Sequence, residues 1–348
     1  MSIEINKWKL DIGMKLMTEL SKIDRFDASW TAIEKREGAV LKQLKSIATV
    51  KSVGASTRIE GSKMSDDEVA VLIENIKIET LEQRDEQEVV GYFEALDMIA
   101  ENYNSIEITE YQIKGLHQLL LKYGGKDGWH RGQYKQLRNA VEASLPDGTK
   151  QTIFQTTEPG IQTQDAMIQL IEWYHNDNET LPLIKAALFV YEFLSIHPFQ
   201  DGNGRLSRLI GSLLLLKKGY SWIQYVSFEH EIENRKSDYY KVLMQTQRNR
   251  PGEDVTEWIM FFINCLLNIQ SNLILKLEES SKASESILSQ REKRIVFFIQ
   301  NHNGCSSGEI SKKLEIALPT VKKTLAELVF KGLIIIKGRG RATGYYVE

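Results

Sequence analysis

The 348-residue sequence has only two cysteines and no long run of apolar residues. Cys265 and Cys305 lie far apart, which excludes a disulfide framework and a zinc site built on cysteine pairs, so we expect both to be core thiols. The first ten residues lack the apolar core of a signal peptide. The longest apolar run, 258–269, is too short to span a bilayer and predicts a buried helix rather than a membrane segment. These absences favour a cytoplasmic protein.

The net charge is small but unevenly distributed. The whole chain carries −3, whereas residues 290–348 carry +6 and the remainder carries −9. This asymmetry indicates a separate C-terminal module. We expect four parts in the chain: a helical N-terminal region at 1–104, a central domain at 105–277, a serine-rich linker at 278–289 and a basic domain at 290–348.

Apolar residues at three- and four-residue spacing predict a mainly helical chain without internal repeats. Ser65 and Glu68 form the pattern of a capping box, and Pro182 suits the first turn of a helix. The helices are expected at 28–52, 66–76, 85–102, 108–122, 162–176, 183–196, 205–218, 235–250, 254–277 and 290–301. The exception is the alternating stretch 139–154, which surrounds a Pro-Asp-Gly turn and predicts a β-hairpin. A helix that continues into the linker is the alternative for 278–289.

The stretch "HPFQDGNGRLSR" at 197–208 combines groups suited to phosphate chemistry. Gly202, Asn203 and Gly204 can turn three backbone N–H groups toward an anion at a helix N-terminus. Arg205 and Arg208 are three apart and share a helix face, from which guanidinium groups can bind phosphate. Two further residues complete the set: Asp201, an oxygen ligand for Mg²⁺, and His197, a general base. The alternative is an ordinary turn in which these groups coincide by chance.

The same stretch resembles the motif HPFx(D/E)GNGRxxR of the Fic family at every specified position. The resemblance, over about 105–270, implies a mainly helical domain that transfers AMP from ATP to a protein hydroxyl with Mg²⁺. It implies that His197 is the base, Phe199 a core anchor and Asp201 the metal ligand. It also implies that Arg208 binds the γ-phosphate, while the remaining motif positions bind phosphates: Gly202, Asn203, Gly204 and Arg205. The second arginine, Arg208, is absent in a branch that phosphorylates its targets, which favours nucleotidyl transfer here; other relatives use other donors.

A second stretch, "STRIEG" at 56–61, resembles the inhibitory pattern (S/T)xxxE(G/N) of Fic proteins. Ser56, Glu60 and Gly61 occupy the specified positions. The resemblance implies a bidentate pair between Glu60 and Arg208 that blocks the γ-phosphate. In some relatives the same glutamate also helps to remove AMP. The alternative is a solvated acid at a helix end.

The flanking resemblances are weaker. In the family the hairpin is a flap that aligns the target segment by strand addition. Here Lys135 stands where an arginine is more usual, and the flap exit lacks a double proline. Tyr239 and Tyr240 resemble the adenine-side helix, although packing is an equal alternative for both. The remaining histidines have no partner pattern and are expected to be structural or exposed: His117, His130, His175, His230 and His302.

Residues 290–348 follow the order helix, helix, helix and two short strands, which resembles winged helix-turn-helix domains. Lys312, Lys313, Lys322 and Lys323 fall on the helices expected in the middle of this module, and Arg339 and Arg341 fall on its wing. DNA binding, protein docking and homodimer formation all stay open. Two functions therefore remain: a self-inhibited adenylyltransferase acting on another protein or itself, and a nucleotide-sensing DNA regulator with little turnover.

Overall fold

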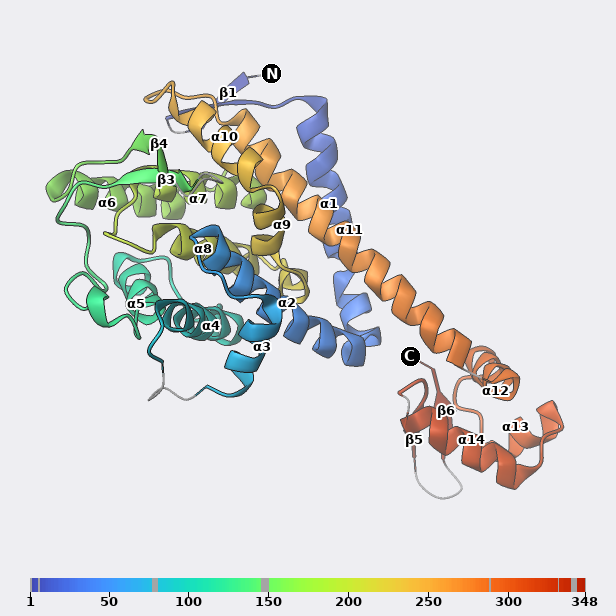
Figure 1. Ribbon diagram of the computed structural model, residues 1–348. Coiled ribbons are helices and arrows are strands. Elements are labelled where there is room, and N and C mark those ends of the chain that lie inside the picture. The colour runs from blue at the N-terminus through green and yellow to red at the C-terminus, as the bar shows by residue number, and fades with distance from the viewer. Residues whose placement is uncertain are drawn as a thin grey trace. The chain divides into compact units, whose positions relative to one another are not determined.

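The computed structural model describes residues 2–5, 7–76, 81–144, 150–287, 289–330, 332–338 and 343–347. The chain divides into two compact units, one of residues 1–34 and 38–273 and one of residues 35–37 and 274–348. Helices dominate both units, which confirms the predicted mainly α class (Figure 1).

The first unit opens with an antiparallel pair, β1 (Ser2–Ile5) and β2 (Trp8–Asp11), and continues with helices. The helices that follow are α1 (Met14–Arg36), α2 (Gly38–Ile59), α3 (Asp66–Glu74), α4 (Arg84–Asn102), α5 (Glu110–Leu120), η2 (Gly125–Asp127), α6 (Ile161–Asn176), α7 (Pro182–Ile196), α8 (Asn203–Lys217), η3 (Ser221–Tyr225), α9 (Phe228–Asn234), α10 (Lys236–Gln247) and α11 (Thr256–Ile287). The part of α11 from Ile274 onward belongs to the second unit. The capping box of Ser65 and Glu68 is present. The single helix predicted at 28–52 is wrong, because α1 and α2 divide it at Glu37.

Helices α7 and α8 form the centre of the first unit. Every residue of α7 from Leu183 to Ile196 is buried, and so is every residue of α8 from Arg205 to Leu216. A helix surrounded by protein on all sides has its ends fixed by packing. Helix α7 packs on α6 and α8, and α8 packs on α2, α4 and α5. The motif at 197–208 therefore joins two rigid elements.

Strands β3 (Ala140–Ser144) and β4 (Lys150–Gln155) form the predicted hairpin. They pair antiparallel from Ala140 opposite Gln155 to Ser144 opposite Lys150, with a bulge between Val141 and Glu142. The predicted Pro-Asp-Gly turn lies at 145–149, outside the described residues.

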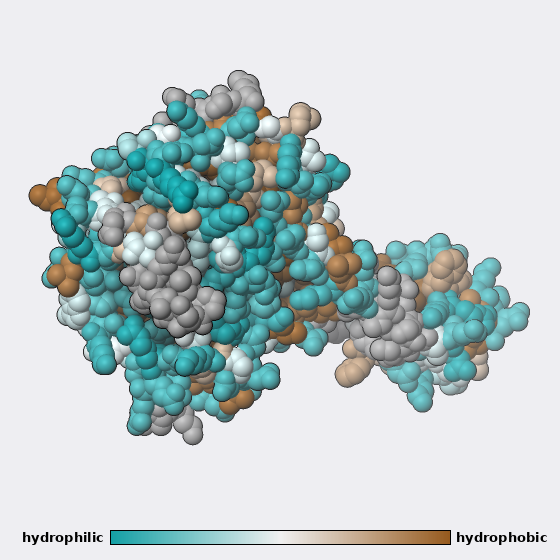
Figure 2. All heavy atoms as spheres, turned by 45° about the horizontal axis from the view of Figure 1, so that its top comes forward, coloured by the Kyte–Doolittle hydropathy of each residue, from teal (hydrophilic) through white to brown (hydrophobic). Residues whose placement is uncertain are grey.

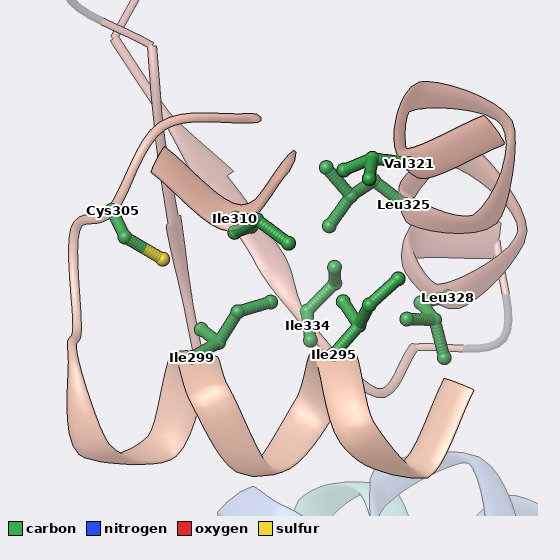
Figure 3. Packing of buried hydrophobic residues seen from close by; sticks show 8 residues of the cluster. All are labelled: Ile295, Ile299, Cys305, Ile310, Val321, Leu325, Leu328 and Ile334. Atoms are coloured by element: carbon green, nitrogen blue, oxygen red, sulfur yellow. The ribbon is translucent and has the colours of Figure 1, made fainter. Parts of the chain in front are cut away.

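The second unit contains α12 (Gln290–Asn301), α13 (Ser307–Leu314), α14 (Leu318–Phe330), β5 (Ile335–Lys337) and β6 (Gly344–Tyr346). The predicted order of three helices and a hairpin is confirmed. Its side chains meet in a small apolar core, shown in Figure 3: Ile295, Ile299, Cys305, Ile310, Val321, Leu325, Leu328 and Ile334. Cys305 and, in the first unit, Cys265 are buried, as expected of core thiols. The wing arginines Arg339 and Arg341 lie outside the described residues.

Helix α11 continues to Ile287, so most of the expected linker is helical. The described helix is much longer than the apolar run at 258–269. Thr256–Glu279 is long and apolar enough to cross a membrane by length and composition alone, yet 56% of its most apolar window is buried in the protein. Trp258, Phe262 and Leu266 are buried, as predicted for a core helix. The face of the molecule in Figure 2 is largely hydrophilic.

Candidate active site

The motif begins where α7 ends. His197 terminates the helix in a left-handed conformation with φ of 52°, and its N–H donates to the Phe193 carbonyl at 2.9 Å. His197 Nδ1 lies 3.3 Å from the Leu194 carbonyl oxygen. Because a carbonyl only accepts, Nδ1 carries the proton and Nε2 the lone pair. Burial, assisted by the Lys135 charge, lowers the pKa of His197 to about 4, so the ring is neutral near pH 7 and can accept a proton.

The loop after His197 is tightly braced. Phe199 is fully buried and stacks on His117 with ring centres 3.9 Å apart. The Asn203 amide closes the loop, since Oδ1 accepts from the Phe199 N–H at 2.9 Å and Nδ2 donates to the Phe199 carbonyl at 2.7 Å. Gly202 has φ of 77°, a region that suits glycine. Asn203 was predicted to hold phosphate, but its side chain is used inside the loop, which leaves the backbone N–H for an anion.

Helix α8 starts at Asn203, and its first turn faces the Glu60 carboxylate. A Cβ built on Gly204 would collide with Glu60 Oε1. The carboxylate therefore occupies the place beside the helix N-terminus that the sequence predicts for an anion. The N-terminal end of a helix dipole stabilises a negative charge there.

Arg208 is 3% exposed and is held by α2 and the turn after it. Its Nη2 lies 2.7 Å from Glu60 Oε1 and 2.9 Å from the Ser56 carbonyl oxygen, and its Nε donates to Ser56 Oγ at 2.9 Å. The predicted bidentate pair is wrong in detail: the carboxylate contacts the guanidinium through one oxygen, and Ser56 accepts from Nε and from the second proton of Nη2. Gly61, with φ of 116°, turns the chain away directly after Glu60.

Asp201, the predicted metal ligand, belongs to a ring of four charged side chains. Arg84 Nη2 and Arg205 Nη2 lie 2.8 and 3.4 Å from Asp201 Oδ2. Glu88 closes the ring, 2.8 Å from Arg84 Nε and 3.1 Å from Arg205 Nη1. Burial would raise the pKa of Asp201, but Arg205, the Gly202 N–H and Arg84 outweigh it and lower the pKa. Asp201 is therefore ionised and available to a cation that displaces Arg84.

These groups surround one cleft of about 320 Å³. His197, Asp201, the Gly202–Gly204 turn and Arg208 line it together with Glu60. Arg205 lies behind Asp201 and is 2% exposed, rather than on the cleft wall that the described residues form. Its predicted direct contact with phosphate therefore has no support in this arrangement.

Tyr239 and Tyr240 also line the cleft, on the side formed by α10. Burial raises the pKa of both phenols, so both stay protonated. Tyr239 additionally packs against Trp258 and Phe261, which fits the packing alternative. Tyr240 is thus the better placed of the two to contact a ligand.

The cleft residues fit Mg²⁺ only together with a phosphate-bearing substrate. Among the described residues no group of three or more histidine, cysteine, aspartate or glutamate side chains is arranged to hold a metal. Asp201 lines the cleft while paired with Arg84 and Arg205, and Glu60 is the other carboxylate on the cleft wall. Mg²⁺ is commonly held by one carboxylate completed by phosphates and water. The volume of the cleft is within the range of small-molecule sites.

Four charged side chains hold the end of α2, which carries Ser56, against α9 and α10, and we call them the latch: Arg58, Asp66, Glu233 and Lys236. Arg58 Nε and Nη2 donate to the two carboxylate oxygens of Glu233 at 2.7 and 3.0 Å. Arg58 also pairs with Asp66 at 2.9 Å, and Lys236 Nζ donates to the Ile59 carbonyl at 2.7 Å. Burial would raise the pKa of Glu233, but hydrogen bonds from His230 and Arg58 hold it at about 2.

This latch predicts a loss of stability in acid. Because the pKa of Glu233 is depressed on folding, its contribution is complete above about pH 4.5 and is lost as the pH falls toward 2. Glu233→Gln should therefore lower the free energy of unfolding at pH 7 and flatten its fall between pH 5 and 2. Denaturant unfolding across that range measures this, with the exposed Glu257→Gln as the control. Parallel curves for wild type and Glu233→Gln would contradict the latch.

Sequence reasoning missed several residues around the site. His117 was expected to be structural, and it is buried, but its Nε2 contacts the Asp201 carbonyl oxygen at 3.0 Å and its Nδ1 accepts from the Gly132 N–H at 2.9 Å. No local signal in the sequence indicated the contacts of Arg84 with Asp201 and of Arg58 with Glu233, because these partners are 117 and 175 residues away. Only contacts in the fold reveal them.

Comparison with known proteins places this site in a family. A family model described as Fic/DOC matches residues 107–215, and one described as winged helix-turn-helix DNA-binding matches residues 288–335. A Fido domain-containing protein of Dictyostelium discoideum is 30% identical over 129 residues, which cover 37% of this chain and 86% of that protein. Protein adenylyltransferase Fic of Drosophila melanogaster is 26% identical over 251 residues, which cover 71% of this chain but 46% of the fruit-fly protein.

Solved structures show the same fold. A Fic family protein from Desulfovibrio desulfuricans superposes with a TM-score of 0.64 at 22% identity, over 97% of both chains. A Fic domain-containing signaling protein from Bacteroides thetaiotaomicron has a TM-score of 0.55 at 24% identity and covers 76% of this chain and 97% of that one. With the match to the Dictyostelium protein, these findings show that the chain belongs to the Fic/DOC family and carries a C-terminal winged helix-turn-helix domain.

Proposed function

We propose that this protein is a self-inhibited, cytoplasmic protein adenylyltransferase. It transfers AMP from ATP to a serine, threonine or tyrosine hydroxyl of a target protein or of itself, and releases pyrophosphate. The observation that carries the proposal is the single cleft in which a neutral His197, an ionised Asp201 and the N-terminus of α8 face Arg208, itself held by Glu60 at 2.7 Å. The relationship to proteins named adenylyltransferases supports the same reaction.

In this reaction His197 Nε2 takes the proton of the target hydroxyl. The hydroxyl oxygen forms a bond to the α-phosphorus while the bond from that phosphorus to the bridging oxygen of pyrophosphate breaks. The protein contributes position and charge rather than covalent chemistry. The fixed end of α7 suits this task, since it holds the imidazole beside the cleft.

The phosphates are assigned to the start of α8. The N–H groups of the Gly202–Gly204 turn bind phosphate oxygens, and Arg208 binds the γ-phosphate. Mg²⁺ held by Asp201 would neutralise phosphate charge when bound. The β3–β4 hairpin borders the cleft through Ala140 and Val141, where it can align an extended target segment by strand addition.

Glu60 supplies the inhibition. Its carboxylate lies against the first turn of α8 and on Arg208, so it takes both contacts that the γ-phosphate needs. ATP could then bind only in an orientation that does not bring the α-phosphorus into line. Removal of Glu60 is the simplest way to expose the activity.

The experiment is label transfer to protein from ATP carrying ³²P at either the α or the γ position, with Mg²⁺ and the Glu60→Gly variant. Transfer of the α label alone supports adenylyl transfer. Transfer of the γ label instead would show phosphorylation. If ATP binds and neither label is transferred, the domain is a nucleotide sensor or uses another donor.

DNA binding is a second proposed function, located in the second unit. The match to a DNA-binding winged-helix family supports it, and Lys322 and Lys323 are exposed on α14, the third helix of the unit. Exposed lysines on such a helix suit contact with phosphates in the DNA backbone.

The double variant Lys322→Ala/Lys323→Ala should weaken DNA binding and reduce its dependence on salt. Each lost phosphate contact lowers the slope of log K against log salt by about one. Mobility shifts of mixed-sequence duplexes at several salt concentrations measure this. Lys293→Ala, on the exposed side of α12, is the control. Identical slopes for all proteins would leave docking or dimer formation as the role of this unit.

A further inference from the structure

Lys135 is buried beside the end of α7, and the hydrogen bonds of its ammonium group go to neutral acceptors. It is 2% exposed, and all three of its ammonium protons have an acceptor. Nζ donates to Asn139 Oδ1 at 2.9 Å, to Thr156 Oγ1 at 2.8 Å and to the Ile196 carbonyl at 3.0 Å. Its backbone N–H donates to the Pro198 carbonyl at 2.8 Å. Lys135 thus binds the chain on both sides of His197.

The other acceptors connect this lysine to the hairpin. Asn139 immediately precedes β3, and Thr156 immediately follows β4. The Thr156 hydroxyl is within hydrogen-bonding distance of the Asn139 carbonyl, at 3.0 Å, so the two ends of the hairpin meet at Lys135. Asn139 Nδ2 in turn donates to the Phe199 carbonyl at 2.8 Å, within the motif loop.

We propose that Lys135 is a positioning residue that fastens the base of the β3–β4 hairpin to the end of α7 and thereby sets the place of His197. The inference deepens the proposed function and rests on it, because it couples the element that would align the target hydroxyl to the group that would take its proton. A cation suits this place, since the C-terminal end of the α7 dipole is negative.

The charge of Lys135 also acts on the imidazole. Burial lowers the pKa of Lys135 to about 8, so it remains mostly protonated at pH 7. Three nearby charges act on the imidazole of His197. The Lys135 ammonium lowers the pKa of His197, and the Glu60 and Asp201 carboxylates raise it. Loss of the ammonium should therefore raise the pKa of His197, and the effect should persist in a Glu60→Gly background.

The test compares Lys135→Met, which keeps the length without the charge, and Lys135→Arg, which keeps the charge, each in Glu60→Gly. Lys135→Met should lower kcat by about tenfold or more, because small misplacement of a reacting group is costly. The dissociation constant for ATP should stay unchanged. The acid limb of the pH–rate profile should move to higher pH, and Lys135→Arg should restore most of the rate. Lys126→Met, at an exposed lysine, is the control.

Two readouts do not depend on transfer activity. The His197 imidazole, assigned in NMR spectra with His197→Gln, should titrate at higher pH in Lys135→Met, and β3 and β4 amides should exchange hydrogen faster. Thr156→Val, which removes one acceptor, should give a smaller change of the same sign. If Lys135→Met folds and leaves rate, titration and exchange as in its parent, the positioning role is overturned. If the parent transfers no label while the titration and exchange shift as stated, the proposed function fails and the link of hairpin to His197 stands.

Discussion

Glu60→Gly is expected to raise label transfer from α-³²P-ATP by about tenfold to a hundredfold over wild type. A hydrogen bond to a charged group contributes about 1.5–3 kcal/mol, and about 1.4 kcal/mol corresponds to a factor of ten. The 2.7 Å contact to Arg208 is of this kind, with the arginine side chain 2% and the glutamate 32% exposed. Its removal frees the guanidinium and the first turn of α8 for phosphate. Autoradiography of the protein alone and with cell lysate measures the change.

The control for this variant is Glu74→Gly, which removes an exposed carboxylate at the end of α3. It should leave transfer at the level of wild type. Glu60→Gln keeps the shape of the side chain without its charge and should fall between the two. Equal transfer by wild type and Glu60→Gly would show that the contact with Arg208 does not restrain the enzyme.

His197→Ala in the Glu60→Gly background is expected to lower transfer by at least about a hundredfold. A positioned general base contributes roughly 10²- to 10⁴-fold, and the His197 lone pair on Nε2 is the base that we propose for this cleft. The affinity for ATP should change little, since the phosphates are assigned to α8 and Arg208. Initial rates and equilibrium binding of ATP, measured on the same preparations, separate the two effects.

His302→Ala, at an exposed histidine of the second unit, serves as the matched control and should keep the full rate. His197→Gln provides a second variant in case alanine disturbs the end of α7, where the residue adopts a left-handed conformation. If His197→Gln retains the rate of its parent, another group removes the proton.

Local patterns predicted much of the fold. Apolar spacing placed α4 to α8 to within about two residues, because those helices bury whole faces. The error at 28–52 arose because the helical spacing of apolar residues continues across Glu37. The sequence there has no proline that would indicate the end of a helix. The hairpin was predicted from alternation and turn residues, which are also local.

The site was predictable only in part. Residues 197–208 are contiguous, so a short motif carries His197, Asp201 and the start of α8 together. Arg208 meets Ser56 and Glu60 across 152 and 148 residues, and only the resemblance to a known inhibitory pattern indicated that contact. Lys135 donates a hydrogen bond to Ile196, which is 61 residues away, and no sequence pattern predicts this contact. The hydrogen bonds of the Asn203 amide to the Phe199 backbone were likewise not predictable, because they depend on the conformation of the loop.

The two contacts from Ser56 give the guanidinium of Arg208 an anchorage that does not involve Glu60. When the carboxylate leaves, the arginine therefore keeps its orientation, and α2 does not have to separate from α8. Release of the proposed inhibition would then amount to a rotamer change of Glu60, which lies just beyond the last turn of α2. Side chains reorient in nanoseconds when they are free to do so, whereas shifts of packed helices take microseconds or longer. If Glu60 inhibits the chain as we propose, the inhibition would act by setting the populations of two side-chain states that a small barrier separates.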